Sequence, residues 1–249
     1  MSEAWCDWRV VGGYRVVYCR EWKHLEEPLL GLGNETVGKR VITYTIPPDT
    51  VRFPKGRSIT TCPGATPWCR LKCYAKNPAK RISWPKNVSK YASNLVLFFE
   101  VGPERFAELL VEKIKRVQRR YNMLKIVRVH VAGDFFSDEY VEAFRIVAES
   151  LPDYQFYAYT RSWLIPELVP SLERLKRLSN FVIYASTDPD TGPPPPGWLE
   201  ACCVDTKYKP GFKPYTKTIR CRGEVADLYC EDCKICIYGR ASVHWEKII

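Results

Sequence analysis

Three cysteines lie close together in the stretch T-T-C-P-G-A-T-P-W-C-R-L-K-C-Y-A-K, residues 60–76. They are Cys62, Cys69 and Cys73, separated by six residues and then by three. Because two prolines and a glycine between the first two cysteines break regular structure, we expect the segment to fold back and bring the three sulfurs together. This spacing differs from the paired spacing of zinc ribbons, and three thiolates with an open fourth position suit a [4Fe-4S] cluster. The alternative is three reduced cysteines packed as small hydrophobic residues.

A second group of four cysteines lies near the end of the sequence and comprises Cys221, Cys230, Cys233 and Cys236. The last three are spaced at two-residue intervals, which is how ferredoxin-like loops surround a cluster. We therefore predict a second [4Fe-4S] site, with Cys221 as its fourth ligand. A structural zinc ion held by the same four thiolates is the alternative.

The remaining cysteines bear on compartment and on the first site. The sequence starts with no apolar signal segment and has no run of 18 apolar residues, so we expect a cytoplasmic protein that does not span a membrane. Reduced cysteines there are metal ligands more readily than disulfides, and Cys202 or Cys203 is the candidate for a fourth ligand of the first site. Because 2 Met, 19 Pro and many charged residues suit a hyperthermophile, where internal disulfides occur, a Cys6–Cys19 bridge is an alternative.

The formal net charge is +10, which attracts polyanions and makes nucleic acid a candidate partner. The segment K-Y-K-P-G-F-K-P-Y-T-K-T-I-R, residues 207–220, interleaves basic and aromatic residues. This composition is typical of grooves that bind single-stranded nucleic acid. A solvated, soluble surface explains the same charge.

The first third of the chain predicts strands and then helices. Two β-prone runs at residues 8–18 are joined by Gly12-Gly13, the signal of a β-hairpin. Residues 40–46 alternate like a strand, and 51–59 supply another that ends at the cysteine loop. We expect helices at 87–100 and at 103–121, the second with one apolar stripe and one basic face.

The middle of the chain alternates strands and helices. We predict strands at residues 126–132, 155–159 and 181–185, a helix capped by Ser137 and ending near Leu151, and a helix at 166–178 that Pro170 bends or divides. Short links between such elements mean parallel strands joined by right-handed crossovers. The fold class is therefore α/β, as a partial or complete β/α barrel or an open doubly wound sheet.

Polar residues follow each of these three strands. Because the carboxyl ends of parallel strands meet on one face, we expect a ligand site there, near the cysteine loop. Capping of the next connection, a core histidine and an ion pair between Arg161 and Asp134 are the alternatives. The candidate ligand-binding residues are His130, Gly133, Asp134, Thr160, Arg161 and Ser186.

Four prolines at 193–196, flanked by glycines, form a stiff linker after this part. We therefore divide the chain into three units. Residues 1–50 are an N-terminal β-hairpin extension, 51–190 a barrel-like core with the three-cysteine loop, and 198–249 a small cysteine-rich, metal-binding C-terminal unit.

Two resemblances rest on these residues. The run T-C-P-G-A-T-P-W-C, then Cys73-Tyr74-Ala75, His130 with Gly133-Asp134-Phe135, Tyr159-Thr160-Arg161-Ser162 and the terminal cysteine triple resemble the phage family called gene product 88. The resemblance covers roughly residues 55 to 240. That family has no settled function, so the match implies a fold and little chemistry.

More distantly, the order of strand, three-cysteine loop, helix and strand ending in a Gly-acid pair is similar to the radical S-adenosylmethionine (radical SAM) enzymes. This implies a partial (β/α) barrel of that type, with the three cysteines holding a four-iron cluster whose open iron takes the methionine part of S-adenosylmethionine. Gly133-Asp134 would then contact the cofactor. The family usually spaces its cysteines by three and two, and its Gly-Gly-Glu-Pro run is replaced here by Ala132-Gly133-Asp134-Phe135.

These observations leave two classes of function. The first is a redox enzyme of radical SAM type, acting on a small molecule, with an open iron at the strand ends and the C-terminal cluster passing electrons. The second is a basic nucleic-acid-binding protein whose clusters or zinc ions are structural.

Overall fold

The structure is a computed structural model that describes residues 4–34, 37–226 and 228–246. The outermost three residues of the predicted N-terminal and C-terminal units lie outside the described residues. The strands are β1 (Cys6–Val11), β2 (Tyr14–Cys19), β3 (Leu30–Asn34), β4 (Gly38–Tyr44), β5 (Thr50–Arg52), β6 (Ser58–Thr60), β7 (Ile126–Val129), β8 (Gln155–Thr160), β9 (Phe181–Thr187), β10 (Leu199–Cys203), β11 (Ile219–Arg220) and β12 (Val243–Trp245). The α-helices are α1 (Pro67–Lys72), α2 (Pro85–Arg120), α3 (Asp138–Ser150), α4 (Val169–Lys176), α5 (Arg222–Val225) and α6 (Cys230–Cys233).

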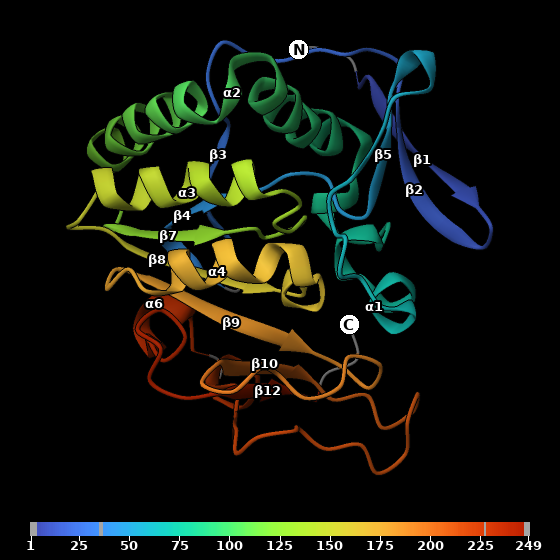
Figure 1. Ribbon diagram of the computed structural model, residues 1–249, viewed down its shortest axis with the longest axis vertical. Coiled ribbons are helices and arrows are strands. Elements are labelled where there is room, and N and C mark those ends of the chain that lie inside the picture. The colour runs from blue at the N-terminus through green and yellow to red at the C-terminus, as the bar shows by residue number, and fades with distance from the viewer. Residues whose placement is uncertain (1–3, 35–36, 227, 247–249) are drawn as a thin grey trace.

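An eight-stranded sheet organises the molecule, in the order β11-β12-β10-β9-β8-β7-β4-β3 (Figure 1). From β4 to β12 every neighbouring pair is parallel, as the alternation of strands and helices predicts. Along β4, β7, β8, β9 and β10 the strand order follows the chain order without reversal. Right-handed crossovers between strands in this order leave their helices on one face, which is the arrangement of a β/α barrel rather than of a doubly wound sheet.

Side chains alternate between the two faces of this sheet. Val127, Val129, Phe156 and Ala158 join the main core together with buried residues of α2, α3 and α4. Neighbouring positions on the same strands, such as Tyr157, face a second apolar cluster that includes Ile237 from the C-terminal segment. Helices thus cover one face, and the cysteine-rich segment covers the other.

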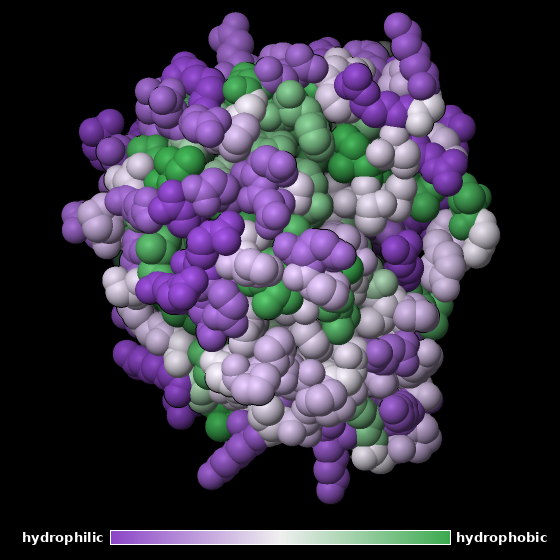
Figure 2. All heavy atoms as spheres, in the orientation of Figure 1, coloured by the Kyte–Doolittle hydropathy of each residue, from purple (hydrophilic) through white to green (hydrophobic). Residues whose placement is uncertain are grey.

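The sheet is nevertheless open in the described part of the chain. Its order runs from β11 at one end to β3 at the other, and these two strands do not pair. The predicted α/β class is confirmed as a mixed α/β fold, and the described part of the chain has no closed barrel. Figure 2 shows hydrophilic side chains over the outer faces of the helices, with hydrophobic residues in scattered patches. Among the described helices, none has the length and apolar content needed to cross a bilayer.

A separate four-stranded sheet, in the order β1-β2-β5-β6, precedes the cysteine loop. The predicted hairpin is present as β1 and β2, and Cys6 pairs with Cys19 in register and is bonded to it as a disulfide. The predicted strand at 51–59 is two short antiparallel strands, β5 and β6. Because β6 ends at Thr60, this smaller sheet holds the start of the cysteine loop.

The two predicted helices at 87–100 and 103–121 are present as the two halves of α2. Gly102, at φ 79° and ψ 170°, separates them, and Pro103 begins the second half. Proline lacks a backbone N–H and suits a first helical turn, so the chain changes direction at this point. The eight-stranded sheet includes strands from all three predicted units. Strands β3 and β4 precede residue 50, and strands β10 and β12 follow residue 198, and all four belong to this sheet.

Candidate functional site

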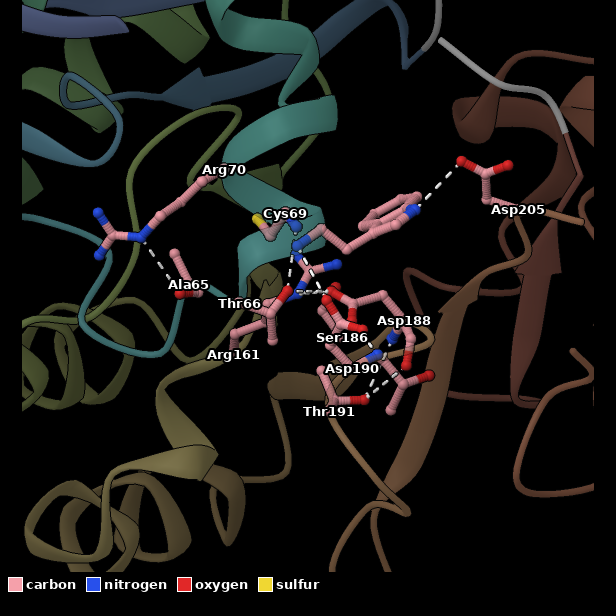
Figure 3. A network of polar contacts seen from close by, with 12 residues as sticks. Ala65, Thr66, Cys69, Arg70, Arg161, Ser186, Asp188, Asp190, Thr191 and Asp205 are labelled. Atoms are coloured by element: carbon pink, nitrogen blue, oxygen red, sulfur yellow. Dashed lines mark hydrogen bonds and ion pairs between the residues drawn. The ribbon is translucent and has the colours of Figure 1, made fainter. Parts of the chain in front are cut away.

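The cysteine loop and the ends of β8 and β9 meet at one carboxylate, Asp188. Its Oδ2 atom accepts hydrogen bonds from the Arg161 Nε–H at 3.0 Å and from the Thr66 hydroxyl at 2.8 Å. Asp188 is fully buried, and the Arg161 side chain is 14% exposed. Thr66 also caps α1, because its Oγ1 accepts the backbone N–H of Cys69 at 3.0 Å. One oxygen thus links the cysteine helix to two strand ends (Figure 3).

The strand ends are joined to one another by Asp134. Its carboxylate accepts the Thr160 hydroxyl at 2.6 Å and the backbone N–H groups of Arg161 and Phe135, each at 2.8 Å. Burial raises the pKa of Asp134 to about 6, and these hydrogen bonds act in the opposite direction. An ion pair between Arg161 and Asp134 is the predicted alternative. It is wrong, because the Arg161 guanidinium pairs with Asp188 instead.

The cysteine loop lies directly against β8. A Cβ atom placed on Gly64 would be 2.1 Å from the carbonyl oxygen of Arg161, so only glycine fits there. The backbone N–H of Asp49 donates to the Cys62 sulfur at 3.2 Å. The buried Asp49 carboxylate in turn pairs with Arg70, at 2.8 Å, and with Lys76. These contacts fix the loop at both of its ends.

The three cysteines of the loop are partly buried, and their thiols influence one another. Burial raises the pKa of Cys62, and Asp134, Cys69 and Cys73 raise it further. Burial also raises the pKa of Cys69, whereas the neighbouring Arg161 opposes this shift. For Cys73 the same cause raises the pKa to about 11. The thiols thus act on one another, but in the described part of the chain the three cysteines do not form a group with metal-holding geometry.

Of the two adjacent cysteines on β10, Cys203 faces this group. Its pKa is raised to about 11 by burial, while a hydrogen bond and the charge of Arg161 act in the opposite direction. Cys202 faces away and interacts with Thr187 and Glu200. The candidate fourth ligand of the first group is therefore Cys203.

The four C-terminal cysteines belong to the segment that covers the sheet face opposite the helices, where Cys230 and Cys236 pack against the sheet. Figure 1 shows α1 beyond the arrowheads of β7 and β9, and α6 near the opposite ends of these strands. Cys221 precedes α5, Cys230 and Cys233 lie on α6, and Cys236 follows in the next turn. Burial raises the pKa of Cys236 to about 12, the Tyr159 phenol opposes this, and the other three thiols add to it. Within residues 4–34, 37–226 and 228–246, no group of three or more His, Cys, Asp or Glu side chains has the geometry that holds a metal ion.

His130, predicted at the site, lies instead in the aromatic core. β7 ends at Val129, and His130 has a φ of 63°, which turns its ring toward Phe135, Tyr140 and Phe144. Its Nε2 atom lies 3.1 Å from the Tyr140 hydroxyl. Burial lowers the pKa of His130 to about 3, so the imidazole is neutral.

The other predicted site residues belong either to the hydrogen-bond network of Asp134 or to the packed interior. Thr160 and Arg161 meet Asp134 as described. Ser186 is buried near Asp188, and its carbonyl accepts the Trp163 indole N–H at 3.3 Å. Gly133, at φ 80°, lies against Ile46, and a Cβ atom at this position would be 2.2 Å from the Ile46 side chain. Packing inside the protein therefore requires glycine at position 133.

Sequence reasoning missed Asp49 and Thr66 as residues that hold the loop. Thr66 could have been found, because Thr-Pro before a cysteine is a helix start with Thr as N-cap and Pro in the first turn. Asp49 could not, since it pairs with Arg70 and Lys76 only after the loop folds back.

Comparisons with known proteins agree on one family. The family model described as Gene product 88 matches residues 25–201. The Gene 88 protein of Mycobacterium phage L5 is 30% identical over 238 residues, covering 85% of this chain and 88% of that protein. The Gene 88 protein of Mycobacterium phage D29 is 29% identical over 234 residues, with the same coverage. No solved structure matches the chain.

Proposed function

This chain belongs to the gene product 88 family, and we propose that it is an iron-sulfur protein with two cysteine-ligated sites, acting as a redox enzyme of radical SAM type. The observation that carries the proposal is the joining of the three-cysteine loop to the ends of β8 and β9 through Arg161, Asp188 and Thr66. A loop that served only as a connection would not need a buried ion pair and a helix cap at its centre.

The donor set suits an iron-sulfur cluster at the first site. Cys62, Cys69 and Cys73 come from one loop and are partly buried, and the cationic Arg161 lies beside Cys69. A nearby cation stabilises thiolates, which are the form that binds metal. Such a cluster supplies one-electron reduction of a ligand bound at its open iron. We propose S-adenosylmethionine as that ligand, from the order of elements that this chain shares with radical SAM enzymes.

Arg161 and Asp134 have different tasks in this proposal. Asp188 accepts the Nε–H of Arg161, and Cys203 bonds to the same side chain. The remaining donors of the planar guanidinium would bind a carboxylate. Asp134 holds the backbone of Arg161 and the Thr160 hydroxyl, so it orients the arginine.

The test is anaerobic purification followed by counting of iron, sulfide and zinc per chain. We expect iron and sulfide at the first site, lost when Cys62, Cys69 and Cys73 are all replaced by Ala. The matched control is Cys202→Ala, which removes a buried thiol that faces away from both groups. Colourless anaerobic protein, or iron content unchanged by the triple replacement, would contradict the proposal. Binding of S-adenosylmethionine, measured by equilibrium dialysis and weakened in Arg161→Lys at unchanged iron content, tests the enzyme class separately.

The C-terminal group is proposed as a second [4Fe-4S] cluster, with zinc as the alternative. Four thiols influence one another there, and both ions accept four thiolates. The same metal count decides between them, because zinc without sulfide at this site would identify the structural zinc ion.

A nucleic-acid-binding function is the second candidate, favoured by the segment from Lys207 to Lys217. Lys207, Lys213 and Lys217 are exposed, and Tyr208 is 42% exposed. The buried Glu200 carboxylate holds this segment by accepting the backbone N–H groups of Tyr215 and Thr216, at 3.1 and 2.7 Å. Salt-dependent binding of single-stranded RNA or DNA by the protein, with a slope reduced by replacing these lysines, would support this function.

A further inference from the structure

A row of polar aromatic and basic side chains crosses the sheet on the face opposite the helices. Arg128 of β7 is in register with Tyr157 of β8, and Tyr159 of β8 with Tyr184 of β9. Paired residues in a parallel sheet point to the same face, so these four side chains are neighbours. The guanidinium of Arg128 lies 5.4 Å from the centre of the Tyr159 ring. The row lies under the cysteine-rich segment that covers this face.

Three polar atoms in this region are buried without a hydrogen-bond partner in the described part of the chain. They are Nε of Arg128 and the hydroxyl oxygens of Tyr157 and Tyr74. Tyr157 is fully buried, and Tyr74 belongs to the cysteine loop, directly after Cys73. Buried polar atoms nearly always have partners, because an unpaired one loses its bonds to water and gains nothing in return. Three together indicate a missing partner.

Arg128 acts on both tyrosines. Burial raises the pKa of Tyr74 to about 12, and Arg128 is the strongest influence in the opposite direction. Burial likewise raises the pKa of Tyr157, again opposed by Arg128. Arg128 also acts on the Cys230 thiol. Arg128 and Tyr157 are paired in register on the sheet face that the C-terminal segment covers.

The chemistry of these groups restricts what binds there. A guanidinium has only donors, and the two phenols each have an O–H to donate. A cation would be repelled by Arg128, and an apolar group would leave all three donors unpaired. An anion with several acceptor oxygens satisfies them together.

We propose that Arg128, Tyr157 and Tyr74 form an interior binding site for a small oxyanion, a carboxylate or phosphate group, on the sheet face that the cysteine-rich segment covers. As the site of a substrate this rests on the proposed redox function, because the ligand would lie within the sheet face that both cysteine groups adjoin. As an anion site it depends on the three donors alone.

The test is isothermal titration calorimetry of the anaerobically purified full chain with inorganic phosphate and with acetate, at constant ionic strength set by chloride. We expect one of the two anions to bind the wild-type protein, which identifies the oxyanion class. Tyr157→Phe removes one donor and should weaken binding at least tenfold, and Arg128→Met should abolish it. The matched control is Tyr184→Phe on the next strand, whose hydroxyl already donates to the Ala241 carbonyl at 3.0 Å, and its affinity should stay within twofold of the wild type.

Tyr157→Phe keeps the test decisive if Arg128→Met fails to fold. The Tyr157 hydroxyl has no hydrogen-bond partner in the described part of the chain, so without anion the Tyr157→Phe variant should melt at the wild-type temperature. The Tyr184→Phe variant should melt at a lower temperature, because it loses the hydrogen bond to Ala241. Failure of both anions to bind, or equal affinity in Tyr157→Phe and the wild type, overturns the inference. Loss of metal from the C-terminal site in Arg128→Met without any anion binding to the wild type also overturns it, because Arg128 would then only balance thiolate charge. Metal counts on the same samples separate the anion-site proposal from the proposed iron-sulfur function. Protein that contains iron but binds no anion contradicts the anion site alone. Colourless protein that binds an anion contradicts the iron-sulfur function alone.

Discussion

Arg161 and Asp188 follow adjacent parallel strands and form an ion pair whose shared oxygen also accepts the hydroxyl of Thr66, the N-cap of the cysteine helix. The pair is therefore a joint between the sheet and the loop that carries Cys69. Buried ion pairs contribute little net stability when complete, but removal of one partner leaves an uncompensated charge. We therefore expect replacement of either Arg161 or Asp188 alone to destabilise the contact between the sheet and the cysteine loop.

Asp188→Asn tests this joint. The amide keeps the shape and one acceptor oxygen but leaves Arg161 without its counter-charge, so we expect a loss of about 3–5 kcal/mol in the free energy of unfolding. Urea unfolding at pH 7 measures it. Glu108→Gln is the control, because Glu108 pairs with Arg105 on the surface, with side chains 61% and 56% exposed, and should change stability by less than about 1 kcal/mol. A loss at Asp188 as small as the control would mean that Arg161 has another partner.

Gly64→Ala tests the contact between the cysteine loop and β8. The new methyl group would meet the backbone of Arg161 at 2.1 Å, and backbone cannot move aside as a flexible side chain does. We expect the loop to shift, with a loss of about 1–3 kcal/mol in the free energy of unfolding and reduced iron at the first site. Gly192→Ala is the control, since its added methyl meets no atom within 4 Å and any cost comes from its φ of 76° alone. Iron content equal in both variants would show that the loop does not depend on this contact.

Much of the central fold could be predicted because its signals are local. Ser137 caps α3 through the N–H of Tyr140, as a serine before two acidic residues predicts, and the apolar runs of β7, β8 and β9 are strands paired in parallel. The smaller sheet could not be predicted, because β2 pairs with β5 across more than 30 residues of chain. A short run such as residues 51–59 does not reveal which sheet it joins.

The candidate site was predictable in part for the same reason. Strand ends are local signals, so Asp134, Thr160 and Arg161 were found, and the parallel topology brings them together. The direction of a single side chain depends on one dihedral angle: the positive φ of His130 turns it into the core, and nothing in its neighbours signals this. Arg128 gave no signal either, since an arginine in a strand is ordinarily taken as exposed.

His130 should make stability depend on pH. Its pKa is lowered by burial to about 3 in the folded protein, whereas it is about 6.5 in the unfolded chain. Below about pH 6.5 the unfolded chain binds a proton that the folded protein does not, so stability is lost as the pH falls, by up to about 1.4 kcal/mol per unit between pH 6 and 4. Asp134 acts in the opposite direction, because its pKa is raised to about 6 and its contribution grows as the pH falls.

The difference between the wild type and His130→Asn isolates the histidine from Asp134. Asparagine tolerates the positive φ and does not titrate, so the variant should be less stable at pH 7 through lost packing but should lose less of its stability on acidification. Urea unfolding at pH 7, 6 and 5 measures both slopes. Parallel slopes for the two proteins would show that His130 is protonated in the folded state and is not buried as described.

The C-terminal cysteines should hold their segment through metal. Residues 219–246 contribute the short strands β11 and β12 to the sheet, and α5 and α6 are helices of four residues each, too short to be stable without an added constraint. Cys233→Ala, or treatment with a chelator, should therefore expose this segment to limited proteolysis before the helical core opens. Cys69→Ala is the matched control, because Cys69 lies on α1 beside Arg161, outside the C-terminal segment, and its loss should leave the C-terminal cleavage pattern unchanged. Identical fragments from Cys233→Ala and the wild type would mean that Ile237, buried against Tyr157 and Val41, holds the segment without a metal ion.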